Sequence, residues 1–255
     1  MSKARILANL ISDNAELADG QISVAEVVGA APLASPTFTG TVTTDVLNVD
    51  EASLLAIATD ISATAVDVFV YRTADDSDGG KWRKRTQHTS WYNEAASATR
   101  GSRKEFPAVA VIVAEATKVT IYDGDDPDMP MWMVFSGGNS HSTFIGFSTG
   151  GTVSSLAMQN GVLVLGTTGS STNGTINAVA VANFVSDVQS KYDELGYNVS
   201  PEGIYDRNNS GHGLWWHSLL ARDTSKQIVN QYVNDVAMTV LPNAPIDAAT
   251  GLPVP

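Results

Sequence analysis

The stretch VSSLAMQNGVLVLGTT, residues 153–168, constrains the fold more than any other feature of the sequence. Two apolar runs flank the dipeptide Asn160-Gly161. Asn-Gly is the favoured central pair of a type I′ turn, because that turn needs a positive φ at both central residues. A type I′ turn joins two antiparallel strands, so the stretch predicts a β-hairpin within an antiparallel sheet.

Several other stretches alternate in polarity or are rich in β-branched and aromatic residues, which is typical of strands. They are VDVFVYR (66–72), AVAVIVA (108–114), KVTIY (118–122), MWMVF (131–135), TFIGF (143–147), NAVAVANFVSD (177–187) and VAMTVL (236–241). Ala, Thr, Ser, Gly, Asn and Val are plentiful while Lys and Glu are scarce, which also favours strands and turns over surface helices. We therefore expect a mainly β fold of hairpins and sheet modules, with a short helical segment at the N-terminus.

The N-terminal segment has a helical pattern of apolar residues. Its stripe, which we predict to make attachment or oligomer contacts, comprises Leu7, Leu10, Asn14 and Leu17. If the leucines occupy heptad core positions, Asn14 falls on the next one, where a polar residue can specify register and oligomeric state. The alternative is an ordinary amphipathic helix that packs on its own domain.

Two prolines, Pro32 and Pro36, end the helical region and favour an extended backbone, and from Thr37 the pattern is strand-like. The predicted organisation has four parts. They are a helical attachment segment at 1–30, an extended Pro/Thr linker at 31–45, a β-rich domain at 46–140, and a second β-rich, propeller-like or incomplete region at 141–255.

Charge and composition exclude several function classes. The formal net charge is −12, which argues against general attraction to nucleic acids or anionic membranes. The chain has no cysteine and four scattered histidines, so we expect no thiolate chemistry, no metal site and no cofactor. Charged residues and Asn interrupt the N-terminal apolar residues, so we expect no signal peptide, no membrane insertion and synthesis in the cytoplasm.

One local charge anomaly is the segment 81–104, which holds seven of the fifteen Lys and Arg residues against a single acid, Glu94. With its aromatic residues it is a candidate contact patch for phosphate, sulfate or a sugar acid. The alternative is that the cations pair with nearby acids or with an acidic neighbouring subunit. The patch residues are Trp82, Arg83, Lys84, Arg85, Trp91, Arg100 and Arg103.

Other motifs favour structural interpretations over chemical ones. The G-x-S-x-G match at 146–150 lacks the helix that a nucleophile elbow needs, which favours a turn. The acidic cluster at 123–128 departs from the EF-hand template, which favours a solvated turn over a calcium site. His212 and His217 flank two tryptophans, and their spacing does not suit metal ligation.

The order of segments up to about residue 45, and the phrase APLASPTFTG at 31–40 in particular, resembles the start of tail fibre proteins of tailed bacteriophages. The resemblance implies that the N-terminal segment attaches the fibre to the virion and that the β-rich remainder faces the host surface. The hairpin at 153–168 with the strand after it resembles the opening blade of a β-propeller. One blade cannot close a propeller, so either the remaining blades lie beyond residue 255 or this is an unrelated β-sheet.

The expected function is therefore a structural virion protein, not an enzyme. It would be a homotrimeric tail fibre subunit that docks to tail, nozzle or baseplate proteins through residues 1–45 and contacts a host glycan or receptor. Two alternatives remain open. One is a fibre-borne enzyme that degrades polysaccharide, with Glu202 or Asp206 as candidate carboxylates, and the other is a stand-alone sugar-binding module.

Overall fold

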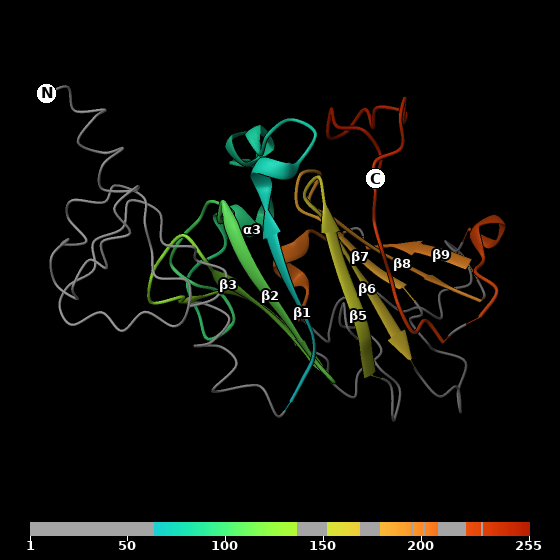
Figure 1. Cartoon of the computed structure of the whole chain (residues 1–255), viewed down its shortest axis with the longest axis horizontal. Helices are drawn as coiled ribbons and strands as arrows, with labels where there is room; N and C mark the ends of the chain where they lie inside the picture. The colour runs from blue at the N-terminus through green and yellow to red at the C-terminus, as the bar shows by residue number, and fades with distance from the viewer. Residues whose placement is uncertain are drawn as a thin grey trace, which may run out of the picture. The chain divides into compact units, whose positions relative to one another are not determined.

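The computed structural model describes residues 64–136, 152–168, 179–194, 196–200, 202–208, 223–230 and 232–255. The described residues form two antiparallel sheets in which the strands follow one another in chain order (Figure 1). One sheet has the order β1-β2-β3-β4, and the other has the order β5-β6-β7-β8-β9. The predicted mainly β fold class is confirmed.

The strand bounds agree with most of the sequence-based expectations. The strands are β1 (Ala65–Arg72), β2 (Val109–Glu115), β3 (Lys118–Asp123), β4 (Met131–Ser136), β5 (Thr152–Gln159), β6 (Val162–Thr168), β7 (Val179–Asn183), β8 (Val188–Asp193) and β9 (Gly196–Val199). The predicted strand at 143–147 and the attachment residues Leu7, Leu10, Asn14 and Leu17 lie outside the described residues.

The Asn160-Gly161 turn joins β5 to β6 as predicted. Both residues have positive φ, 50° and 74°, as a type I′ turn requires. Gln159 pairs with Val162 directly before and after the turn, and the antiparallel register continues to Ser155 and Gly166, beyond which it shifts between Val153 and Ser155. The local sequence signal alone therefore places this hairpin correctly.

Short helices and turns connect the strands of the first sheet. Between β1 and β2 lie η2 (Thr73–Asp75), η3 (Lys81–Arg85) and α3 (Ser90–Asn93). Two further short helices, η4 (Ile204–Asp206) and η5 (Thr224–Lys226), follow the second sheet. The side-chain hydroxyl of Thr89 caps α3 by accepting from the N–H of Tyr92. No helix in the described ranges is long and apolar enough to cross a membrane.

Both sheets contribute to one hydrophobic cluster. At its centre are aromatic rings, with Phe106 lying 4.8 Å from Trp132 and 5.0 Å from Phe184 between ring centroids. Phe184 follows β7 and Trp132 lies in β4, so the rings connect the two sheets. The predicted domain boundary at residue 140 and the linker at 31–45 lie outside the described residues, and the propeller interpretation stays a prediction.

One predicted strand, at residues 236–241, does not form a strand of either sheet. Residues 236–241 are extended but belong to neither sheet. The segment just before them runs against the second sheet, where Val233 donates its N–H to the carbonyl of Thr167 at 3.1 Å and Ser155 Oγ donates to Asp235 at 2.7 Å. The strand prediction at 236–241 is therefore wrong for the chain on its own, because no ladder partner lies beside it among the described residues.

Candidate functional site

The two tryptophans of the segment 81–104 lie in the core. Trp82 and Trp91 are each 0% exposed, and both belong to the hydrophobic cluster that the two sheets share. Their indole N–H groups are also paired within the chain, to the carboxylate of Asp76 at 2.7 Å and to the carbonyl of Phe184 at 2.9 Å. Neither side chain has exposed surface with which to contact a ligand.

Arg100 is buried as well, and its hydrogen bonds link separate segments of the backbone. Its guanidinium donates to four carbonyl oxygens and lies 4.4 Å above the ring of Trp132. Burial lowers the pKa of Arg100 to about 10, against the opposing effect of Glu94, so the group remains a cation at neutral pH. It therefore joins the loop before β2 to β4.

Three more cations form ion pairs within the chain. Arg83 lies 3.1 Å and Lys84 lies 2.8 Å from the carboxylate oxygens of Glu105. Arg85 lies 3.2 Å from Asp78, whose buried carboxylate oxygens have no hydrogen bond of good geometry within the described residues. These contacts match the alternative in which the cations pair with nearby acids, while contact with an external ligand stays a prediction.

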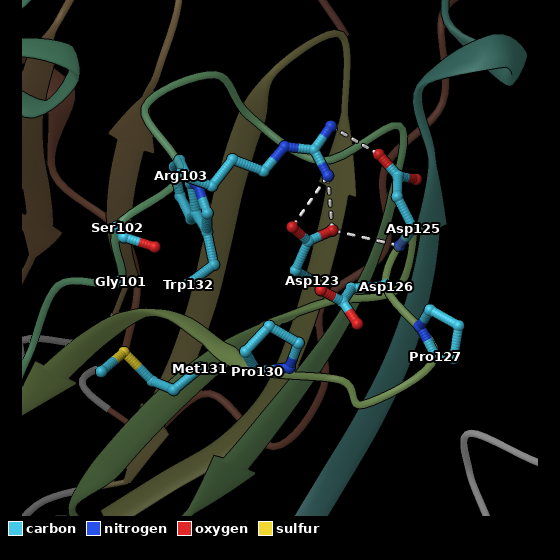
Figure 2. A pocket seen from close by; sticks show the side chains of 10 residues that line it. All are labelled: Gly101, Ser102, Arg103, Asp123, Asp125, Asp126, Pro127, Pro130, Met131 and Trp132. Atoms are coloured by element: carbon cyan, nitrogen blue, oxygen red, sulfur yellow. Dashed lines mark hydrogen bonds and ion pairs between the residues drawn. The ribbon is translucent and has the colours of Figure 1, made fainter.

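Arg103 differs because it lines a recess of about 440 Å³ on the first sheet (Figure 2). Its Nη1 lies 2.6 Å and 2.8 Å from the two oxygens of Asp123, and its Nη2 lies 2.6 Å from Asp125. We call this recess the Arg103 pocket. It is lined by Gly101, Ser102, Arg103, Asp123, Asp125, Asp126, Pro127, Pro130, Met131 and Trp132.

The acidic turn after β3 forms one wall of the Arg103 pocket. The carboxylate of Asp125 accepts from the N–H groups of Ala108 and Val109, each at 2.8 Å, and so ties the turn to the start of β2. Burial by itself would raise the pKa of Asp125, but these two hydrogen bonds and the Arg103 guanidinium outweigh it and lower the pKa. The turn is thus held in place by its own carboxylates.

The opposite wall comes from β4 and the loop before β2. Gly101 donates its N–H to the carbonyl of Trp132 at 2.8 Å, and a Cβ at Gly101 would clash with the carbonyl of Met131. The close approach of these two segments therefore requires glycine at this position. The lining of the recess therefore combines two prolines and Met131 with both acceptor and donor groups.

The groups of the Arg103 pocket suit one kind of recognition chemistry. Carboxylates that accept and a guanidinium that donates can exchange hydrogen bonds with several hydroxyl groups of one ligand. Apolar walls can cover the C–H face of the same ligand. Arg103 carries one positive charge while three carboxylates line the recess, so the arrangement favours a neutral, hydroxyl-rich ligand over an anion.

The sequence did not indicate an ion pair between the buried Arg207 and the half-buried Glu94. Arg207 is 1% exposed, and its Nη1 and Nη2 lie 2.7 Å and 3.1 Å from the oxygens of Glu94. Its remaining donors reach the carbonyls of Val134 and Thr99, each at 2.8 Å. The two residues are 113 positions apart in the chain, so no local pattern links them.

Of the other sequence-based candidates, the structure describes only the two carboxylates near η4. Asp206 is 4% exposed on η4, and Glu202 lies just before that helix. The G-x-S-x-G match, His212 and His217 lie outside the described residues. Within the described ranges, no group of three His, Cys, Asp or Glu side chains is arranged to hold a metal ion, including the acidic turn at 123–128.

Comparison of the chain with protein-family models, with curated proteins and with solved structures finds no match.

Proposed function

We propose that the chain is a structural virion protein, a tail fibre subunit that joins the phage tail through residues 1–45 and presents a rigid β module to the host surface. The observation that carries the proposal is the Arg103 pocket, whose donors and acceptors are held in place by contacts within the chain. The N-terminal resemblance supports the virion role.

The ion pairs around the first sheet support a binding role. Arg83, Arg85 and Arg103 each contact a carboxylate from another segment of the chain. The contacts of Arg103 with Asp123 and Asp125, and that of Arg83 with Asp125 at 4.0 Å, fix the loops that border the Arg103 pocket before any ligand arrives. A pre-organised site loses less conformational entropy on binding, which suits a module that contacts its target repeatedly.

The ligand class that fits the Arg103 pocket is a glycan of the host surface. A single site of this size is weak by itself. Several copies in a homotrimeric fibre would engage one surface at high effective concentration and so raise the overall affinity. The partners in the proposal are therefore other copies of the chain, tail proteins and a host glycan.

The experiment measures binding of the purified full chain to immobilised bacterial lipopolysaccharides and capsular polysaccharides. Asp126 is exposed in the wall of the Arg103 pocket, and Asp128 is exposed in the same turn but outside the lining. We expect Asp126→Asn to weaken binding about tenfold, and Asp128→Asn to leave it unchanged, because only the former loses a charged acceptor at the site. Equal effects of the two variants, or no binding to any polysaccharide, would overturn the role of the pocket.

The same experiment separates the alternatives. Release of new reducing ends from a bound polysaccharide would replace the structural proposal with a fibre-borne enzyme. Binding by a monomer that is never found in particles would favour a stand-alone sugar-binding module. The mass of the purified chain in solution tests the trimer directly.

A further inference from the structure

Residues 236–241, VAMTVL, form an extended segment with an open main chain. Among the described residues, none donates to or accepts from the backbone of residues 237–240. Before this stretch the N–H of Val236 donates to Ser155 Oγ at 3.2 Å, and after it the carbonyl of Leu241 accepts from Ala244 at 3.0 Å. The stretch between them has the composition of a strand but pairs with no strand of the described residues.

The side chains of this segment alternate as they do in a strand. Val236, Met238 and Val240 are half-buried, while Ala237 and Thr239 are exposed. Val236 and Met238 line a groove of about 810 Å³ whose other wall includes Val164 and Val181 of the second sheet. One face of the segment therefore already packs against the second sheet.

The segment itself is uncharged and mostly apolar, although Asp235 and Asp247 line the recesses beside it. No charged residue occurs from Val236 to Ile246, although the chain as a whole carries a net charge of −12. Leu241 and Ile246 are 66% and 61% exposed. Two copies of so acidic a chain repel each other over most of their surface, and that repulsion is weakest where an uncharged segment meets its own copy.

The pattern is also symmetric about Met238. Ala237 and Thr239, one position to either side, are small and exposed, and Val236 and Val240, two positions away, are valines that are half-buried. An antiparallel pair of two identical segments centred on Met238 places Val236 opposite Val240 and Ala237 opposite Thr239. Valine then lies opposite valine, and a small exposed residue lies opposite another small exposed residue. The half-buried side chains of both copies all point to the same face of the pair.

We propose that residues 236–241 form a two-fold interface in which the segment pairs as an antiparallel strand with the same segment of a second copy. The main-chain N–H and C=O groups of Ala237 and Thr239 would supply the hydrogen bonds, with Met238 at a non-hydrogen-bonded position, and the valines would supply the contacts between copies. This contact is separate from the threefold symmetry that the resemblance implies, and it stands whether or not the chain is a fibre subunit.

The first test is the mass of the full chain in solution as a function of concentration. Proline at residue 239 has no N–H to donate, and Thr239 makes no hydrogen bond within the described residues that the change would break. We expect Thr239→Pro to halve the mass of the assembly, and Thr239→Val, which keeps the N–H and favours strands, to leave it unchanged. An assembly mass that is the same in both variants overturns the proposal.

The second test determines the register of the proposed strand pair by disulfide crosslinking, and it does not depend on the first test. The chain has no cysteine, so a single introduced thiol can only link two copies. Opposed residues in antiparallel strands have Cα atoms about 4.5–5.5 Å apart, which a disulfide can span. We expect Met238→Cys to form a covalent dimer on mild oxidation.

Thr239→Cys is the matched control for the register. With the pair centred on Met238, the two residues at 239 are diagonal neighbours about 7–8 Å apart, which is too far for a disulfide. Crosslinking of Met238→Cys but not Thr239→Cys supports the proposed pairing. Equal crosslinking of both variants, or of neither, contradicts it.

Discussion

The carboxylate of Asp76, the residue that follows η2, accepts a 2.7 Å hydrogen bond from the N–H of Asn160 in the turn between β5 and β6. The same carboxylate accepts from the hydroxyl of Tyr71 and from the indole N–H of Trp82. Tyr71 in turn accepts from the N–H of Gly161 at 2.9 Å. One buried acid thus ties the first sheet to the turn of the second sheet.

We expect Asp76→Ala to lower the free energy of unfolding by about 3 kcal/mol or more, because it leaves three buried donors without an acceptor. Denaturant unfolding followed by tryptophan fluorescence measures the change. Asp75→Ala is the matched control, since Asp75 is exposed, and it should change stability by less than about 0.5 kcal/mol. A similar loss in both variants would argue against the role of Asp76.

Gly161→Ala tests the close packing of the turn. A Cβ at Gly161 would lie 2.7 Å from Val185 Cγ2, and the residue has φ of 74°. Gly79 has φ of 65° and no atom within 4 Å of its Cβ position, so Gly79→Ala isolates the backbone strain. We expect Gly79→Ala to destabilise by about 1 kcal/mol and Gly161→Ala by about 1–3 kcal/mol more. Equal losses would show that the turn has room to relax.

The stability contributed by Asp125 should depend on pH. Its pKa in the folded chain is lowered, chiefly because two backbone N–H groups and Arg103 outweigh the effect of burial. The carboxylate therefore stabilises the folded state above its unfolded pKa of about 3.9, and the stabilisation is lost as the pH falls through the lower folded value. We expect the difference in unfolding free energy between the unmodified chain and Asp125→Asn to shrink over that acid range. A difference that does not change with pH would contradict this assignment.

Removal of residues 1–36 tests the proposed docking role. We expect a chain that keeps its β circular-dichroism spectrum and cooperative unfolding but is no longer incorporated into particles, because the proposed attachment segment is absent. The full-length chain, produced in the same infected cells, is the control. Incorporation of the shortened chain at the control level would remove the docking role from this segment.

Strand prediction succeeded where the signal was local and failed where it was not. The hairpins of β2 with β3 and of β5 with β6 follow from alternating apolar residues and short turns between them. Strands β8 and β9 were not predicted, because segments such as VQSKYD carry polar and charged residues between their apolar ones. Pairing with β7 makes β8 a strand.

The site could be predicted in part only. The sequence marked the segment 81–104 as unusual and offered pairing with acids as one interpretation. It did not indicate that Arg103 would meet Asp123 across 20 positions, or that Trp82 and Trp91 would be buried. Aromatic residues between cations suggest a contact surface, but the two sheets need large rings to fill the space between them.

The sequence by itself determined that this chain forms antiparallel β structure, since alternation of residue types and Asn-Gly turn chemistry act over a few neighbouring positions. Only the tertiary structure decided which carboxylate each cation meets and which aromatic residues face solvent. The physical reason is distance along the chain. Asp76 and Asn160 are 84 positions apart, and such groups become neighbours only after both sheets have packed on one core.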